Sequence, residues 1–148
     1  MYKVTKDLQD FCLAHRLGKG YPGKCKNLHG HNYSVQVTLD SSCLDQYDMV
    51  IDFGDIKKYL NTWVQDNWDH ATMVTKDDKV LLNFLEVEDQ RRFVVDEDQN
   101  STAEFMSKFL FEKFQEIIEK EVGGEVGILE VKVWETADSF ATWTRPSM

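Results

Sequence analysis

The segment with the clearest potential for chemistry is a pair of histidines, His29 and His31, separated only by Gly30. In an extended chain alternate side chains leave the same face, so both imidazoles point in one direction. The glycine between them lets another backbone approach closely. A thiol, Cys25, stands shortly before the pair. The chain has only 4 histidines, so two this close together indicate a site.

A third imidazole, His15, belongs to a preceding segment that alternates like a strand. If the two segments pair, three nitrogens converge and one coordination position stays open. Catalytic zinc sites have this composition, whereas structural zinc sites are closed by four cysteine or histidine ligands. The sequence therefore predicts a metal centre of His15, His29 and His31. The alternative, a hydrogen-bonded core histidine, accounts for one such residue better than for three.

The charge pattern argues for an anionic small molecule and against nucleic acid. The formal net charge of −9 is unfavourable for a nucleic-acid-binding protein. Between Asp10 and Asp40, however, the chain has no acidic residue and carries four cations: Arg16, Lys19, Lys24 and Lys26. A positive pocket there would attract an anionic ligand. The alternative is a solvated loop with chance cations.

Composition also bears on compartment. The 3 cysteines, odd in number and widely spaced, do not form a disulfide framework, which predicts a reducing, cytoplasmic location. No apolar run has the length of a membrane helix or a signal-peptide core, so no membrane partner is expected. Cys12 and Cys43 receive no role.

Periodicity predicts one α+β domain over residues 1–148, with an antiparallel four-stranded sheet and two helices on one face. The predicted strands are 4–17, 31–39, 93–95 and 128–136, and the predicted helices are 54–68, a short stretch within 80–85 and a helix ending near 123–124. A capping box begins the last helix, with Ser101 as the N-cap and Glu104 three residues later. Glu135 falls on the apolar face of the last strand, where a carboxylate must be paired or used.

Two ordered motifs carry a resemblance to a known family. The patterns Phe11-x-x-Ala14-His15-Arg16-Leu17 and Cys25-x-x-x-His29-Gly30-His31-Asn32-Tyr33 resemble the 6-pyruvoyl-tetrahydropterin synthase / 6-carboxytetrahydropterin synthase family. Further landmarks follow in order: Ile51-Asp52-Phe53, Asp69-His70, Thr102-Ala103-Glu104 and Glu135-Thr136. The resemblance implies the tunnelling fold, in which subunits join their sheets into a barrel. It also implies a homohexamer, a dimer of trimers, with active sites at subunit interfaces.

The resemblance implies a role for each chemical residue. The three histidines look like the family's Zn²⁺ ligands, and the substrate would be dihydroneopterin triphosphate. Zinc makes the protons of the substrate's side-chain hydroxyls more acidic. Cys25 resembles the general base, and a free thiol is mostly protonated near neutrality, so it needs help. His70, oriented by Asp69, looks like that helper.

Two further positions are implied in pterin binding. Glu135 matches the family's carboxylate that holds the pterin ring's amino and ring N–H groups. Thr102 matches a pterin-contacting position, although a helix-cap role explains it equally well. The chain departs from the family pattern at Ser101, where a proline is common, and at Met73-Val74, which replaces a leucine-asparagine pair.

The family contains two activities that share these residues. Pyruvoyl enzymes eliminate triphosphate, whereas carboxy enzymes also break a carbon–carbon bond and release acetaldehyde. Cys25 and His29 are separated by Lys26-Asn27-Leu28, and this short loop resembles the carboxy branch of lyases, which feeds 7-deazapurine (queuosine-type) synthesis. Two other classes remain: a tunnelling-fold protein that binds zinc and pterin without turnover, and a zinc hydrolase. The hydrolase predicts a His-Glu-x-x-His motif, and the sequence has none.

Overall fold

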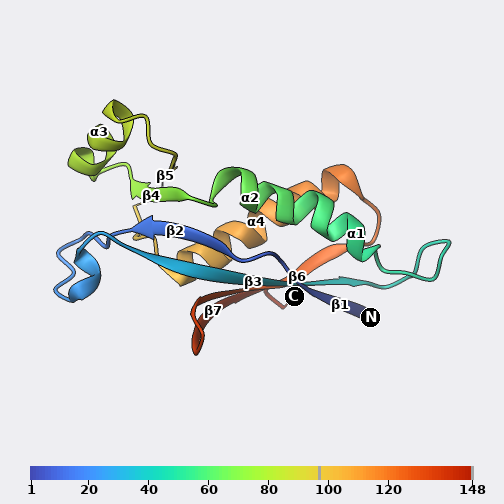
Figure 1. Ribbon diagram of the computed structural model, residues 1–148. Helices are drawn as coiled ribbons and strands as arrows, with labels where there is room; N and C mark the ends of the chain where they lie inside the picture. The colour runs from blue at the N-terminus through green and yellow to red at the C-terminus, as the bar shows by residue number, and fades with distance from the viewer. Residues whose placement is uncertain (97, 148) are drawn as a thin grey trace.

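The computed structural model describes residues 1–96 and 98–147 as a twisted sheet with helices packed against one face (Figure 1). Within those residues the sheet has seven strands in the order β5-β4-β2-β3-β6-β7, and β1 also pairs with β3. The strands are β1 (Tyr2–Asp7), β2 (Phe11–His15), β3 (His29–Ser41), β4 (Ala71–Thr75), β5 (Arg92–Val95), β6 (Gly127–Thr136) and β7 (Ser139–Thr144). The predicted α+β class is confirmed.

Strand β3 is the longest strand and the one on which the sheet is built. Its apolar residues alternate with polar ones, so Tyr33, Val35 and Val37 are buried under the helices. One edge of β3 pairs antiparallel with β6. The other edge pairs antiparallel with β1 over residues 36–41 and with β2 over residues 29–33.

The strand predicted over residues 4–17 is therefore two strands, both paired with β3. The chain leaves the ladder between Asp7 and Phe11, although the amide of Leu8 still donates to the carbonyl of Val35 at 2.8 Å. The buried Leu8 side chain fills this break. Because the break is short, β2 continues in the direction of β1 and brings His15 to the start of β3.

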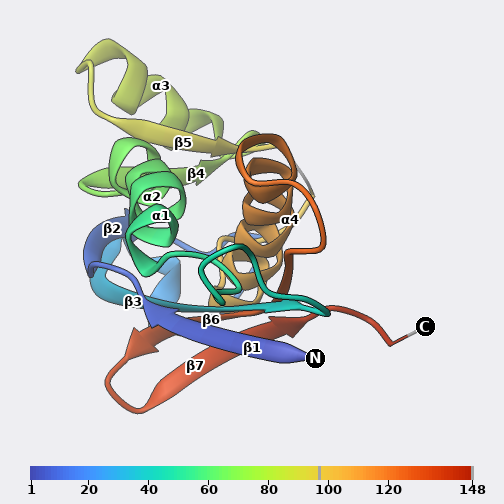
Figure 2. The ribbon, with the colours of Figure 1, turned by 90° about the vertical axis from the view of Figure 1, so that its right-hand side faces the viewer.

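Two helical segments lie side by side on one face of the sheet (Figure 2). The first is a continuous run of α1 (Phe53–Ile56), a π-helical stretch (Lys57–Asn61) and α2 (Thr62–Asn67), which confirms the helix predicted over 54–68. The second is α4 (Ala103–Glu121). Their core-facing side chains recur at helical spacing and join one cluster with the sheet: Ile56, Leu60, Val64, Met106, Leu110, Phe114 and Ile118.

The N-cap of α4 corrects one prediction. Thr102, not Ser101, is the cap: its hydroxyl accepts from the amide of Phe105 at 3.2 Å. Ser101 is displaced from that role because it lies one residue earlier and its hydroxyl lies 3.1 Å from Nδ1 of His15. The capping-box pattern fits Ser101 alone, because Phe105 rather than Glu or Gln follows three residues after Thr102. The tertiary contact of Ser101 with His15 therefore overrides the local pattern.

The sheet is larger than the predicted four-stranded antiparallel sheet with two helices. Strand β4 pairs in parallel with both β2 and β5, and α3 (Lys79–Val87) connects β4 to β5. A helical crossover of this kind is what permits parallel pairing. The helix expected within 80–85 and the strand at 93–95 are thereby confirmed. The unpredicted β7 is a mostly exposed edge strand, so it lacks a strong apolar alternation.

Within the described residues, no helix has both the length and the apolar character needed to cross a lipid bilayer.

Candidate functional site

The three predicted metal ligands converge at one end of the sheet. In the β2–β3 register His15 lies directly opposite His29, and His31 follows on the same face. The ring centroids are 4.7 Å apart for His15 and His29, 5.5 Å for His15 and His31, and 4.9 Å for His29 and His31. One nitrogen from each ring lies within 4.8 Å of the others, so the group could hold a metal ion.

Backbone carbonyls orient two of these rings. Nδ1 of His15 donates to the carbonyl of Ser101 at 2.7 Å, and Nδ1 of His29 donates to the carbonyl of Asn27 at 2.6 Å. A carbonyl oxygen only accepts, so the proton of each ring is on Nδ1 and Nε2 keeps its lone pair. Carbonyls commonly fix metal-bound histidines in this manner.

The Nε2 atoms of His29 and His31 are buried and have no hydrogen-bond partner among the described residues. Buried polar atoms in proteins are nearly always satisfied, and a bound ion would satisfy both. The residues therefore fit a divalent metal.

Burial also sets the protonation state of the centre. His15 is 1% exposed, and desolvation lowers its pKa to about 4 despite its hydrogen bond to Ser101. The ring is neutral near pH 7, which is the form that binds a metal.

Glu135 faces the histidines from β6. Its Oε1 lies 3.2 Å from Nε2 of His31 and 3.9 Å from Nε2 of His15, although the nearer approach lacks hydrogen-bond geometry. The β6–β7 register shifts between Trp134 and Thr136, and such a bulge re-aims the side chain within it. Glu135 therefore lies beside the histidines without a hydrogen bond to His31.

Tyr33 forms the buried wall of the site, a role that was not predicted from the sequence. Its ring is fully buried, and its hydroxyl lies 3.5 Å from Nε2 of His15. Burial raises the pKa of Tyr33, and the nearby charges of Glu135 and Cys25 raise it further. The alternation of side chains along β3 puts Tyr33 on the same face as His31, and this pattern could have identified it from the sequence.

Cys25 lies beside this wall on a 3₁₀ turn, Lys24–Lys26. Its carbonyl accepts from the amide of Leu17 at 2.8 Å, which ties the turn to the end of β2, and its thiol is partly buried. Lys24 and Lys26 flank it and are exposed.

Two of the four cations in the predicted positive pocket already have partners within the chain. Arg16 donates to both carboxylate oxygens of Asp78 at 2.7 and 2.6 Å. Lys19 donates to the carbonyl of Asp98 at 2.7 Å. Lys24 and Lys26 are therefore the cations best placed for an anionic ligand.

The Asp69–His70 pair is formed on another part of the sheet. Nδ1 of His70 lies 3.0 Å from Oδ2 of Asp69, and the His70 side chain is 76% exposed. Burial opposes ionisation of Asp69, yet hydrogen bonds from the Cys12 amide and His70 lower its pKa overall. The thiol that clusters with this pair within one chain is Cys12, not Cys25.

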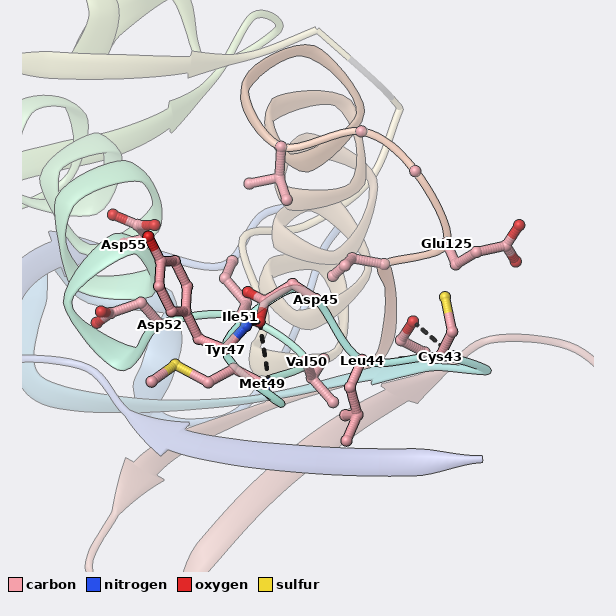
Figure 3. Close-up of a pocket in the computed structure, with 15 residues that line it drawn as sticks. Cys43, Leu44, Asp45, Tyr47, Met49, Val50, Ile51, Asp52, Asp55 and Glu125 are labelled. Atoms are coloured by element: carbon pink, nitrogen blue, oxygen red, sulfur yellow. Dashed lines mark hydrogen bonds between the residues drawn. The ribbon is translucent and has the colours of Figure 1, made fainter.

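A cavity of about 580 Å³ lies away from the histidines. It is next to Ser41, at the opposite end of β3 from His29. Figure 3 shows its lining from the loop after β3, from α1 and from the turn after α4, with Asp45, Asp52, Asp55 and Glu125 around it. Its lining contains no histidine, so it offers none of the chemistry described above.

The chain is similar to known proteins over nearly its full length. A family model described as 6-pyruvoyl tetrahydropterin synthase matches residues 3–146. A 6-carboxy-5,6,7,8-tetrahydropterin synthase from Haemophilus influenzae is 30% identical over 149 residues, which cover 97% of this chain and 99% of the relative. The protein of the same name from Rickettsia felis is 32% identical over 142 residues, covering 95% and 98%.

Solved structures show the same fold. An uncharacterized protein from Wolinella succinogenes superposes with a TM-score of 0.81 at 22% identity and covers 98% of each chain. The 6-pyruvoyl tetrahydropterin synthase of Caenorhabditis elegans superposes with a TM-score of 0.68 at 26% identity, covering 99% of this chain and 98% of its own.

Proposed function

This chain belongs to the 6-pyruvoyl tetrahydropterin synthase family of pterin-processing enzymes, and on that premise we propose that it is a zinc-dependent 6-carboxy-5,6,7,8-tetrahydropterin synthase. It converts 7,8-dihydroneopterin triphosphate to the 6-carboxy product and releases acetaldehyde and triphosphate. The observation that carries the choice is the short loop Lys26-Asn27-Leu28 between Cys25 and His29. Relatives that carry the carboxy name over nearly the full length support it.

The histidines hold the metal in this proposal. His15, His29 and His31 would hold it through three ring nitrogens, with Glu135 and Tyr33 beside them. When bound, zinc acts as a Lewis acid that makes the hydroxyl protons of the substrate side chain more acidic. The neutral state of His15 keeps this centre ready for a cation at physiological pH.

Cys25 takes a proton from the substrate side chain as general base. Its turn lies next to the buried wall formed by Tyr33. A displacement of the thiolate by about an ångström can change which substrate proton it reaches. The short loop between Cys25 and His29 would fix where the thiolate can reach. Lys24 and Lys26, on the same turn, attract the triphosphate.

His70 and Asp69 serve as the proton relay, and Glu135 holds the pterin. The exposed His70 ring is available to a second subunit, which agrees with active sites built at interfaces in a homohexamer. The carboxylate oxygens of Glu135 accept hydrogen bonds from the amino and ring N–H groups of the pterin.

Product analysis tests the proposal. The purified protein is incubated with 7,8-dihydroneopterin triphosphate while acetaldehyde is trapped as a hydrazone and triphosphate is counted. Equimolar acetaldehyde and triphosphate are expected. Triphosphate without acetaldehyde, with 6-pyruvoyl-tetrahydropterin accumulating, would assign the chain to the pyruvoyl branch. Binding with neither product would make it a pterin-binding protein.

A further inference from the structure

A second group of metal-ligating side chains lies on the opposite face of the sheet from the histidine centre. Along β2 the side chains of Phe11, Leu13 and His15 are buried, whereas Cys12 and Ala14 alternate to the other face. Asp69 and His70 stand immediately before β4, which pairs in parallel with β2. The pairing brings Asp69 and His70 beside Cys12.

The three side chains are held close together. Sγ of Cys12 lies 3.8 Å from Oδ1 of Asp69, and Nδ1 of His70 lies 3.0 Å from Oδ2 of the same carboxylate. One ligand atom from each residue lies within 4.8 Å of the other two. A thiolate, an imidazole and a carboxylate form a donor set that suits Zn²⁺ and Co²⁺.

Main-chain hydrogen bonds fix the positions of these ligands. The amide of Cys12 donates to Oδ1 of Asp69 at 3.1 Å, and the amide of His70 donates to the carbonyl of Cys12 at 2.8 Å. His70 has a φ of 60°, a left-handed conformation that is uncommon for a non-glycine residue and turns its ring out of the strand direction. The ligands are thus positioned by the backbone before any ion binds.

An open cavity adjoins the cluster and gives it access to solvent. Its volume is about 400 Å³, and Cys12, Ala14, Gly30, His70 and Thr72 are among the residues that line it. A metal held by three protein atoms here would keep at least one position for water.

We propose that Cys12, Asp69 and His70 form a second site for a divalent transition metal, separate from the three-histidine centre. Binding releases the Cys12 thiol proton to solvent, and the thiolate, the Asp69 carboxylate and the His70 imidazole coordinate the ion. One consequence of this site, inhibition of turnover by excess metal, rests on the function proposed above. An ion on Asp69 and His70 removes both from the proton relay, so excess metal inhibits turnover.

Cobalt spectroscopy tests the site without turnover. Protein carrying one zinc per chain is titrated with Co²⁺, and a thiolate-to-cobalt charge-transfer band is expected as this second ion binds. The band should be lost in Cys12→Ser and kept in Cys43→Ser, a matched control at an exposed thiol. His70→Ala, a change at an exposed side chain that leaves the fold intact, should weaken cobalt binding at least about tenfold.

Three results would overturn the site: no band in the unaltered protein, a band that survives Cys12→Ser, or a band that is lost in Cys25→Ser instead. The inhibition is tested separately with excess Zn²⁺. Unaltered protein should lose turnover, whereas Cys12→Ser should keep its basal turnover and need at least about tenfold more zinc. Equal sensitivity of the two proteins would refute inhibition through this site. Absence of turnover at every zinc level would contradict the proposed function while the cobalt result still decides the site.

Discussion

The carboxylate of Asp40, at the end of β3, accepts hydrogen bonds from both terminal nitrogens of Arg145, just past β7. Asp40 is 3% exposed, and Arg145 also donates to the carbonyl of Ile128 at 3.2 Å. The guanidinium thus joins β3, β6 and the end of β7 at the end of the strands that is far from the histidines.

Removing this guanidinium should destabilise the protein. Arg145→Met leaves the buried Asp40 carboxylate without its partner, and we expect the free energy of unfolding to fall by about 1–3 kcal/mol. Urea denaturation measures it. Lys120→Met, a change at an exposed helix residue, is the control and should stay within about 0.5 kcal/mol. Equal effects of the two changes would mean that the Asp40–Arg145 pair adds no stability.

Stability should depend on pH through Asp78. Its hydrogen bonds with Arg16, followed by the Leu81 amide, hold the pKa of this carboxyl below its usual range. A depressed pKa contributes stability that is present above the unfolded value of about 3.9 and is lost as pH falls through the folded value. Asp78→Asn should therefore cost about 1 kcal/mol near pH 7 and progressively less below about pH 4. Asp77→Asn, at the exposed neighbour, is the control; a cost of Asp78→Asn that is constant with pH would contradict the assignment.

Metal content tests the histidine centre. Dialysed protein should hold about one zinc per chain, the stoichiometry of a single tight three-histidine site. His29→Ala should lose most of that zinc, because two nitrogens remain and the Asn27 carbonyl loses its donor. His70→Ala should keep it. Tight zinc binding by His29→Ala would remove the three histidines as the ligand set.

Kinetics test Cys25 as the base. Cys25→Ala should fold and keep its zinc but lose turnover by about 10²–10⁴-fold, the usual contribution of a general base. Cys43→Ala, at an exposed thiol, should retain full activity. Near-normal turnover in Cys25→Ala would move the role to His70 or to water.

Light scattering tests the assembly. Among the described residues, β5, β7 and β1 each pair with a single strand and therefore present unpaired backbone groups to a neighbour. The expected species at micromolar concentration is a hexamer. A monomer that still turns over substrate would show that each chain contains a complete active site.

Local periodicity was sufficient for the parts of the fold that bury one face. The alternation around Tyr33 and the helical recurrence of Ile56, Leu60 and Val64 both match the structure. The same reasoning missed β4 because its parallel pairing with β2 depends on a helical crossover distant in sequence. It missed β7 because an edge strand buries too little to need a regular apolar pattern.

Part of the candidate site could be predicted from the sequence for a similar reason. His29 and His31 needed only the geometry of one strand, and His15 needed one antiparallel pairing. Ser101 contacts His15 from 86 positions away, so no local pattern reveals it. The bulge that aims Glu135 at the histidines is likewise a property of the paired strands rather than of either strand alone.

All three imidazoles belong to a single hairpin, β2–β3, whereas Ser101 and Glu135 follow much later in the chain. During synthesis a nascent chain therefore exposes its complete set of nitrogens before the residues that orient them have left the ribosome. A metal ion bound at that stage would hold β2 against β3, and its binding free energy would offset part of the entropy lost in closing the hairpin.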